Sequence, residues 1–308
     1  MQAVWDILPK TIAAILQQLP PSWHEQIEEI RVRVLRPLEV IVKGKAHFLP
    51  YQVTSEDGIH LLNKLSQYSI YAIEEELKRG FITVQGGHRV GLAGKVVTDG
   101  GSVKAIRHVT SFNIRIAKQR IGIAEPLLPY VYNGRWYNTM IIGSPQTGKT
   151  TLLRDAARMI SMGINEKHIP SQKVGIVDER SEIAGCVKGI PQFELGNRVD
   201  VLDACPKAEG MMMMIRSMSP DVLIVDEIGR AEDSEAILEA VNAGVCIWTT
   251  VHGRKWKDVF QRPTLRPIIE QGVFDRFVEL TNEYGPGTVR RITDANGVVL
   301  YEQAVRSR

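Results

Sequence analysis

The apolar positions in the first third of the chain repeat with two different periods, which predicts a mixture of helices and strands. Over residues 5–19 the apolar residues recur at helical spacing, so one amphipathic helix is expected there. Residues 27–35 and 38–44 instead alternate between apolar and polar on either side of Pro37, as two strands joined by a turn would. This part of the chain is therefore expected to contain both α and β structure.

A second helix followed by a strand meander is expected next. Residues 55–80 have a helical pattern that opens with the capping residue Ser55 and ends at Gly80. The turn Asp99-Gly100-Gly101 lies within the strand region that follows. The strand-like segments of that region are 81–87, 88–97, 102–106 and 111–117.

The pattern changes after residue 117. Residues 118–136 suggest a linker with one short helix, and four strongly apolar runs then alternate with helical segments. Such an alternation is typical of a parallel sheet that is buried on both faces. The tail beyond Phe274 returns to hairpin-like strands, with turns at Pro286-Gly287 and Asn296-Gly297. The four apolar runs are 137–142, 174–177, 222–225 and 245–251.

These patterns predict two domains. A smaller α+β domain is expected over residues 1–117, a linker over 118–136, and an α/β domain with a mostly parallel sheet over 137–308. A chain of 308 residues is long enough for two domains of ordinary size.

The composition is that of a soluble globular protein, with 44% hydrophobic and 24% charged residues. No apolar run approaches the roughly 18 residues of a membrane-spanning helix, and the start lacks the basic head of a signal peptide. A cytoplasmic location is therefore expected, with a peripheral membrane contact left open. The 3 cysteines are widely spaced and indicate neither a zinc site nor a disulfide framework. A net charge of +3 is too small to indicate nucleic-acid binding by itself.

The strongest chemical signal is the segment GSPQTGKT, residues 143–150, which matches the phosphate-binding pattern GxxxxGK[ST]. It lies between an apolar strand and a helix, where backbone N–H groups and the helix N-terminus can bind phosphate. Lys149 is expected to reach the β- and γ-phosphates of ATP, and the Thr150 hydroxyl to bind Mg²⁺. The residues expected to bind the nucleotide are Gly143, Ser144, Pro145, Gln146, Thr147, Gly148, Lys149, Thr150 and Thr151.

A second signal is the apolar strand 222–225, which ends in Asp226 and Glu227. An acidic strand end is the usual partner of a phosphate loop, where one carboxylate binds Mg²⁺ and another activates water. Adjacent side chains of a strand point to opposite faces, so the two acids are expected to have different tasks. We assign the metal to Asp226 and the catalytic base to Glu227.

Two further groups of polar residues have both a functional and a structural interpretation. His252 ends the next strand and is placed to sense the γ-phosphate, although a histidine at a strand end is often only solvated or capping. Asp178, Glu179 and Glu182 follow the strand 174–177. They act either at Mg²⁺ and the attacking water or as the charged start of a helix.

The order of these motifs resembles that in the secretion, or traffic, ATPases of type II and type IV systems. More closely, the chain resembles the family of stage III sporulation protein AA, over roughly residues 81–253. The segments that carry the resemblance are GKTTLLRD, VDERSEIAG, RVDVLDACPKAEGM, IRSMSPDVLIVDEIG and NAGVCIWTTVHG.

The resemblance implies a RecA-like, homohexameric ATPase that uses ATP and Mg²⁺. It implies a place in the mother-cell cytoplasm of an endospore-forming bacterium, at the inner face of a membrane. There the protein would power a secretion-like channel between mother cell and forespore, with a membrane protein of that channel as its partner and no specific nucleic acid.

The resemblance also assigns tasks to individual residues. Asp178, Glu179 and Glu182 fall on the acid-rich strand of the traffic ATPases, which places Glu179 at the metal and Glu182 among the catalytic groups. Glu227 falls on the glutamate of their Walker B strand and His252 on the histidine of a conserved box. Further positions are an arginine before the Walker B strand and arginines that the N-terminal domain delivers to the γ-phosphate. Arg216 matches the arginine before the Walker B strand. Arg115 is the first candidate for the arginine at the γ-phosphate, and Arg107 and Arg89 are the next candidates.

The chain departs from the family pattern at two places. Many secretion ATPases have glycine where Asp226 stands, so this chain has a fuller metal-binding strand end. Within the phosphate loop, Pro145-Gln146-Thr147 replaces a glycine-rich centre, which changes the rigidity of the loop but leaves the backbone N–H groups of 146 and 147 in place.

Two rival functions follow from the same motifs. The first is a nucleic-acid-dependent RecA-like ATPase or translocase, which the basic residues of the N-terminal domain favour. Against it, aromatic residues make up only 6% of the chain, and no stacking platform lies among the basic residues. The second is a nucleotide switch that binds ATP without hydrolysing it, and the presence of Glu227 argues against that. The basic residues concerned are Lys43, Lys45, Lys104, Arg115 and Lys118.

Overall fold

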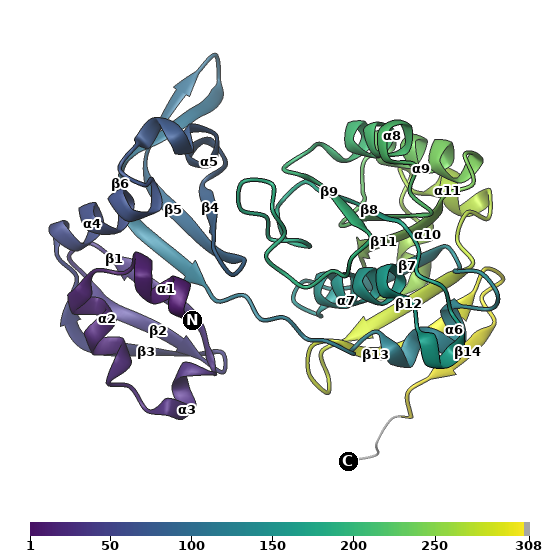
Figure 1. Cartoon of the computed structure of the whole chain (residues 1–308), viewed down its shortest axis with the longest axis horizontal. Helices are drawn as coiled ribbons and strands as arrows, with labels where there is room; N and C mark the ends of the chain where they lie inside the picture. Colours follow the sequence, from purple (N-terminus) through teal and green to yellow (C-terminus); the bar gives the residue numbers. More distant parts are fainter. Residues whose placement is uncertain (305–308) are drawn as a thin grey trace. The chain divides into compact units, whose positions relative to one another are not determined.

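The computed structural model describes residues 1–304. The chain divides into two compact units, Met1–Lys118 and Gln119–Arg308, and each is described here by itself (Figure 1). Within the described residues no helix has both the length and the apolar character that crossing a membrane requires.

The first unit contains a six-stranded sheet in the order β3-β2-β1-β6-β5-β4, in which every neighbouring pair is antiparallel. Its helices cover an apolar cluster that includes Ile30, Leu61 and Phe112. The strands are β1 (Ile27–Arg33), β2 (Pro37–Val42), β3 (Lys45–Gln52), β4 (Phe81–Val84), β5 (His88–Asp99) and β6 (Ser102–Arg115). The helices are α1 (Gln2–Ile7), α2 (Lys10–Gln17), α3 (Pro21–His24), α4 (Ser55–Leu65), the 3₁₀ helix η1 (Ile70–Ile73) and α5 (Glu74–Arg79).

Both long helices expected in this unit are interrupted. The first is broken by Pro9, which cannot donate a backbone hydrogen bond and instead starts α2 as its N-cap. The second is broken where Gln67 and Tyr68 take positive φ angles of 50° and 62°, so α4 and α5 are separate. Gly80 ends α5 as expected, with a φ of 80°.

Three further details of the first unit differ from the sequence expectation. The cap of α4 is Thr54, whose side chain accepts a hydrogen bond from the Asp57 N–H, and Ser55 is the first helical residue. Strand β3 had not been expected. The expected strands 102–106 and 111–117 are one strand, β6, because bulges in its pairing with β5 let the chain bend without ending the ladder.

The second unit contains an eight-stranded sheet in the order β14-β13-β12-β7-β11-β10-β8-β9. The run from β12 to β9 is parallel, and β13 and β14 extend it as antiparallel strands. The strands are β7 (Thr139–Gly143), β8 (Val174–Asp178), β9 (Val199–Asp203), β10 (Val222–Val225), β11 (Cys246–His252), β12 (Arg276–Thr281), β13 (Thr288–Asp294) and β14 (Val299–Glu302). The helices are η2 (Glu125–Leu127), α6 (Leu128–Val131), α7 (Lys149–Met162), η3 (Asn165–Lys167), α8 (Lys207–Met218), α9 (Ala231–Asn242), α10 (Trp256–Phe260) and α11 (Arg266–Glu270).

Alternate residues of the central strands pack into two separate cores, one on each face of this sheet. Ile224 and Trp248 lie in the core beneath α6 and α7, whereas Leu223 and Ile247 lie in the core beneath α8, α9, α10 and α11 (Figure 1). The structure therefore confirms the α/β fold with a mostly parallel sheet and helices on both faces.

Residues 119–136, expected as a linker, belong to the second unit, and Leu127, Val131 and Trp136 lie in its core. Strand β9 had not been expected, because its sequence VDVLD carries two acids and is only partly buried.

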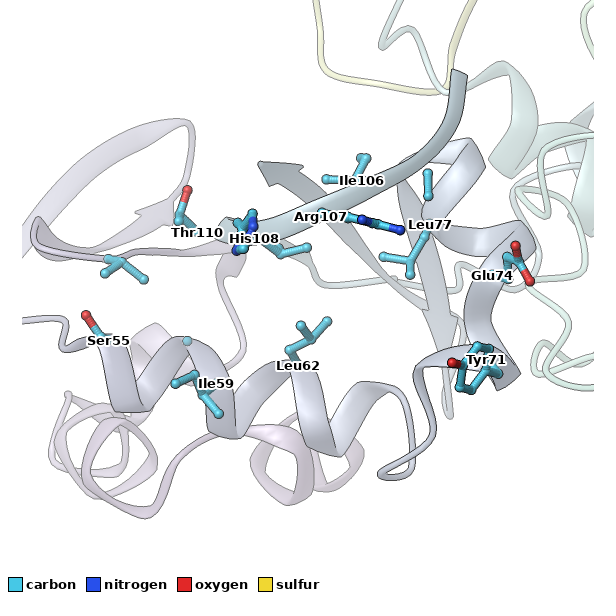
Figure 2. Close-up of a pocket in the computed structure, with 14 residues that line it drawn as sticks. Ser55, Ile59, Leu62, Tyr71, Glu74, Leu77, Ile106, Arg107, His108 and Thr110 are labelled. Carbon is cyan, nitrogen blue, oxygen red and sulfur yellow. The ribbon is translucent and has the colours of Figure 1, made fainter. Parts of the chain in front are cut away.

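The first unit also has a groove of about 640 Å³ beside β6. Figure 2 shows Ser55, Ile59 and Leu62 of α4 on one side of it, and Ile106, His108 and Thr110 of β6 on the other. Six consecutive residues of β6, 105–110, line the groove. His108 has a φ of 47°, so the regular alternation of side chains is interrupted within this stretch.

Candidate active site

The phosphate loop joins β7 to α7, as the sequence predicts. Lys149 is the first residue of α7, and Gly148 precedes it with a φ of 89°. The Lys149 ammonium donates to the carbonyl oxygens of Gly143 and Ser144, each at 3.0 Å. Gln146 has a φ of 63°, so the unusual centre of the loop contains a left-handed residue that is not glycine. The loop thus curls around the lysine that is expected to bind phosphate.

Lys149 is 7% exposed, and burial lowers the pKa of its ammonium, an effect that the nearby carboxylates of Asp226, Glu227 and Glu182 oppose. Its ammonium also lies 3.3 Å from Nδ1 of His252, at the end of β11. A charged lysine can only donate, so Nδ1 of His252 must accept and its proton must be on Nε2. The task expected of His252, sensing the γ-phosphate, stays a prediction.

Asp226 follows β10 and is fixed by two hydroxyl groups. The Thr150 hydroxyl donates to its Oδ2 at 2.7 Å, and the Thr250 hydroxyl of β11 donates to its Oδ1. A threonine hydroxyl and a carboxylate are oxygen ligands of the kind that Mg²⁺ takes, and Mg²⁺ in nucleotide sites completes its shell with phosphate and water. Within residues 1–304 no cluster of three His, Cys, Asp or Glu forms a metal site made of protein alone. Thr150 and Asp226 therefore fit a metal that binds together with a nucleotide.

Glu227 is held in an unusual backbone conformation. Its φ is 57°, and its N–H donates to the Thr250 hydroxyl at 2.9 Å. Strand β10 ends at Val225, so simple strand alternation does not set the directions of the two acids. The left-handed residue does so instead, and both acids contact β11.

The carboxylate of Glu227 has a partner on each oxygen. His252 Nε2 contacts Oε1, and Nη1 of Arg180 lies 2.8 Å from Oε2. Lys149, His252, Glu227 and Arg180 thus form a continuous chain of polar contacts from the phosphate loop to the protein surface.

Asp178, at the end of β8, has a structural task. Its carboxylate accepts the backbone N–H groups of residues 182, 183 and 184 at 2.8–2.9 Å. Burial raises its pKa to about 6, and the charges of Asp203 and Asp226 add to this, although the backbone hydrogen bonds oppose it. No helix starts here within the described residues, since the next helix, α8, begins at Lys207. The acids are therefore not the charged start of a helix.

The other predicted acids share one narrow cleft. It is lined by Asp178, Glu179, Arg180, Glu182, Lys207, Asp226 and Glu227. Within it the Glu179 carboxylate pairs with the Lys207 ammonium at 2.6 Å. The backbone carbonyl of Glu182 accepts a hydrogen bond from the guanidinium of the buried Arg154, which also donates to the carbonyl of Ile183 at 2.6 Å. The structure thus brings Glu179, Glu182, Asp226 and Glu227 to one place.

Three of the predicted arginines belong to the first unit, and the fourth lies on α8. Arg115 is in the first unit on β6, where its guanidinium lies 3.9 Å from the Glu29 carboxylate and is 60% exposed. Arg107 and Arg89 are on β6 and β5 of the same unit. Arg216 is on α8 and lines a separate hollow between α8 and α9.

The structure adds three residues to the predicted set. Thr250 contacts both acids that follow β10, Arg180 pairs with Glu227, and Arg154 supports the turn after β8. The sequence gives a partial signal for Thr250, because it is polar within an otherwise apolar strand. For Arg180 and Arg154 the sequence contains no comparable signal, since Arg180 lies in a run of charged residues and Arg154 lies in an amphipathic helix, where an arginine is ordinary.

The β12–β13 hairpin contacts the phosphate loop directly. The Gly287 N–H, in the turn between β12 and β13, donates to the Thr147 carbonyl at 2.7 Å. A Cβ atom on Gly148 would lie only 2.7 Å from the Gly287 nitrogen. Gly148 is therefore required both for its positive φ and for this close approach.

Comparison with known proteins gives a family and a fold. Residues 1–300 match the family described as sporulation stage III, protein AA. Stage III sporulation protein AA of Bacillus subtilis (strain 168) is 55% identical over 300 residues, which cover 97% of each chain. The protein SEEDLING PLASTID DEVELOPMENT 1 of Arabidopsis thaliana is 26% identical over 83% of this chain and 36% of its own.

Among solved structures, the ATPase DotB of Legionella pneumophila superposes with a TM-score of 0.60 at 16% identity, over 88% of this chain and 76% of its own. The pilus retraction motor PilT with bound ADP gives a TM-score of 0.56 at 18% identity, over 83% of this chain and 75% of its own. At these identities the likeness concerns the fold, which is the RecA-like fold expected from the sequence.

Proposed function

The chain belongs to the family of sporulation stage III protein AA, and we propose that it is an ATP hydrolase that powers a secretion-like channel or its assembly. The observation that carries this proposal is the chain of contacts in which Thr150 and Thr250 hold Asp226 while Thr250 and His252 hold Glu227. This arrangement joins a phosphate loop to a metal ligand and a base, which are the parts that phosphoryl transfer to water needs.

In this proposal the residues divide the work between binding and chemistry. Lys149 and the backbone N–H groups of residues 143–151 bind the phosphates of ATP. Thr150 and Asp226, with Glu179 beside them, would hold Mg²⁺, which offsets phosphate charge when it is bound. Glu227 accepts the proton of the attacking water, and Glu182 lies in the same cleft.

His252 and Arg115 complete the proposed site. His252 already contacts both Lys149 and Glu227, so a change at the γ-phosphate reaches the base through one side chain. Arg115, with Arg107 and Arg89 as alternatives, is the exposed cation that the first unit would deliver to the γ-phosphate. Movement of the N-terminal domain, 1–117, against the ATPase domain, 137–308, would then convert hydrolysis into work.

The biological setting is part of the same proposal. The match to the sporulation family supports a role in spore formation. The resemblance to the traffic ATPases is the ground for proposing a homo-oligomer, a hexamer, on the cytoplasmic, mother-cell side of a membrane. Its partner there would be a membrane protein of the channel. The alternative, a nucleic-acid-dependent translocase with the same fold, rests on the basic residues of the N-terminal domain, and none of the comparisons favours it over the secretion-type ATPase.

The test is steady-state ATP hydrolysis by the full chain with Mg²⁺, with and without single-stranded DNA or RNA. Glu227→Gln should bind ATP but lower kcat by about a hundredfold to ten-thousandfold, the usual contribution of a general base. Glu166→Gln, at an exposed acid of the second unit, is the matched control and should keep full activity.

The two ways of failing are distinct. Full turnover by Glu227→Gln would remove the base from the mechanism. A many-fold rise in rate with nucleic acid would identify a nucleic-acid motor in place of a secretion-type ATPase.

A further inference from the structure

Arg180 contacts one carboxylate oxygen of Glu227, the proposed catalytic base. Its guanidinium lies 2.8 Å from Oε2 of Glu227, while His252 contacts the other oxygen. A general base must direct a lone pair of a carboxylate oxygen at the attacking water. In this arrangement the two contacts fix the direction of the Glu227 carboxylate, so it can turn toward the water only when a contact opens.

The turn that carries Arg180 is fixed on both sides. Before it, the Asp178 carboxylate accepts three backbone N–H groups of residues 182–184. After it, the Ser181 hydroxyl donates to Asp203 at 2.6 Å, and Ser181 itself has a φ of 52°. These contacts therefore hold the backbone of Arg180 in place, and only the long side chain of Arg180 is free to change direction.

The two ion pairs of this cleft differ in how easily they open. Lys207 and Glu179 are 12% and 27% exposed, so their pair is largely shielded from solvent. Arg180 is 60% exposed, and an ion pair with so exposed a member is weak and is screened by salt. The pair between Arg180 and Glu227 is thus the one that can be broken and remade during a reaction cycle.

We propose that Arg180 is a positioning residue that holds the Glu227 carboxylate away from the attacking water until the γ-phosphate of ATP is bound. This inference rests on the proposed ATPase function and adds a regulator of its base. The γ-phosphate draws Lys149 away from His252, because an ammonium binds phosphate oxygens more strongly than a neutral imidazole. His252 is then free to turn and the carboxylate loses one of its two partners. Only the weak pair with the exposed Arg180 then remains to be broken in each turnover.

The test compares ATP hydrolysis by the full chain and by Arg180→Ala. Removing the restraint should raise kcat by up to about fivefold, the factor that corresponds to an exposed ion pair of about 1 kcal/mol, with KM for ATP unchanged. Arg180→Lys keeps the charge and should behave like the wild type. Arg266→Ala breaks another exposed pair, with Glu270 at 2.7 Å, and should leave kcat unchanged.

Salt gives a readout that a purely structural role would not move. As salt rises to about 0.5 M, screening should raise the kcat of the wild type toward that of Arg180→Ala, whose own kcat should change little. A kcat of Arg180→Ala that equals or falls below the wild-type value, in a protein whose turnover requires Glu227, overturns the inference alone. If neither protein hydrolyses ATP, the proposed function fails together with it.

Discussion

The two units of this chain use polar residues in opposite ways. In the first unit, neighbouring strands are antiparallel, and the buried polar residues lie singly. Asp57 caps α4, Glu39 pairs with Arg33, and the His88 ring accepts the Ala117 N–H at 3.0 Å. Each of these contacts is local and structural.

In the second unit, the parallel strands β7, β8, β10 and β11 all end at the same edge of the sheet. Lys149, Asp178, Asp226 and His252 follow those ends and form one connected cluster with Glu227. The difference shows that strand direction, more than residue composition, decides whether charged residues form a site, because antiparallel neighbours point their ends to opposite edges.

The largest expected effect tests whether the polar cluster of the second unit binds nucleotide, and it is the loss of ATP affinity when Lys149 is replaced. Lys149→Ala removes a cation that is expected to reach two phosphates, and hydrogen bonds to charged groups contribute about 1.5–3 kcal/mol each. The Kd for ATP should therefore rise about a hundredfold or more. Titration of a fluorescent ATP analogue measures it, with Lys167→Ala at an exposed lysine of the same unit as the control.

Retention of wild-type affinity by Lys149→Ala would place phosphate binding outside the cluster at the strand ends.

The next expected effect is a pH dependence of stability, which has opposite signs in the two units. Burial lowers the pKa of His88 to about 4 from 6.5, so the unfolded chain binds the proton more readily than the folded one. The contribution of His88 to stability is thus complete above pH 6.5 and is lost as pH falls toward 4, by on the order of 3 kcal/mol in total. The protection factors of the amides of β5 and β6, which are corrected for the intrinsic pH dependence of hydrogen exchange, should fall over this range.

His88→Gln keeps an acceptor for the Ala117 N–H and does not titrate, so it should abolish this dependence. Asp178 acts with the opposite sign in the second unit. Because its pKa is raised from 3.8 to about 6, its contribution is greatest below 3.8 and is lost as pH rises through about 6. A first unit whose amide protection factors remain constant from pH 6.5 to 4 would contradict the assignment of His88.

The smallest effect separates backbone strain from crowding at the phosphate loop. Gly148 and Gly244 have similar φ angles of 89° and 81°, but only Gly148 has the Gly287 backbone within reach of a Cβ atom. Gly244→Ala should cost about 1 kcal/mol in the free energy of unfolding, from the left-handed conformation alone. Gly148→Ala should cost about 1–2 kcal/mol more, because the hairpin must move. Urea unfolding measures both variants, and equal losses would show that the contact with Gly287 carries no energy.

The sequence predicts most of the site because its signals are local. The phosphate loop, Asp226 and Glu227 each follow an apolar run, and the position of each depends on the strand before it. The double role of Thr250 and the pairing of Arg180 depend on which strands become neighbours, which a single sequence does not state. The interruptions at Pro9 and at Gln67 were missed because the helical spacing of apolar residues continues across both.

The contact between Gly287 and the phosphate loop has a consequence for how this chain can evolve. The turn between β12 and β13 and the loop before α7 are far apart in the sequence, yet the backbone of one fills the space that a side chain of the other would need. An insertion or deletion in that turn therefore alters the phosphate loop as directly as a substitution within the loop. The two segments can change only together, so the length of this surface turn is constrained by the phosphate loop, although the length of such a turn is ordinarily the most variable feature of a protein.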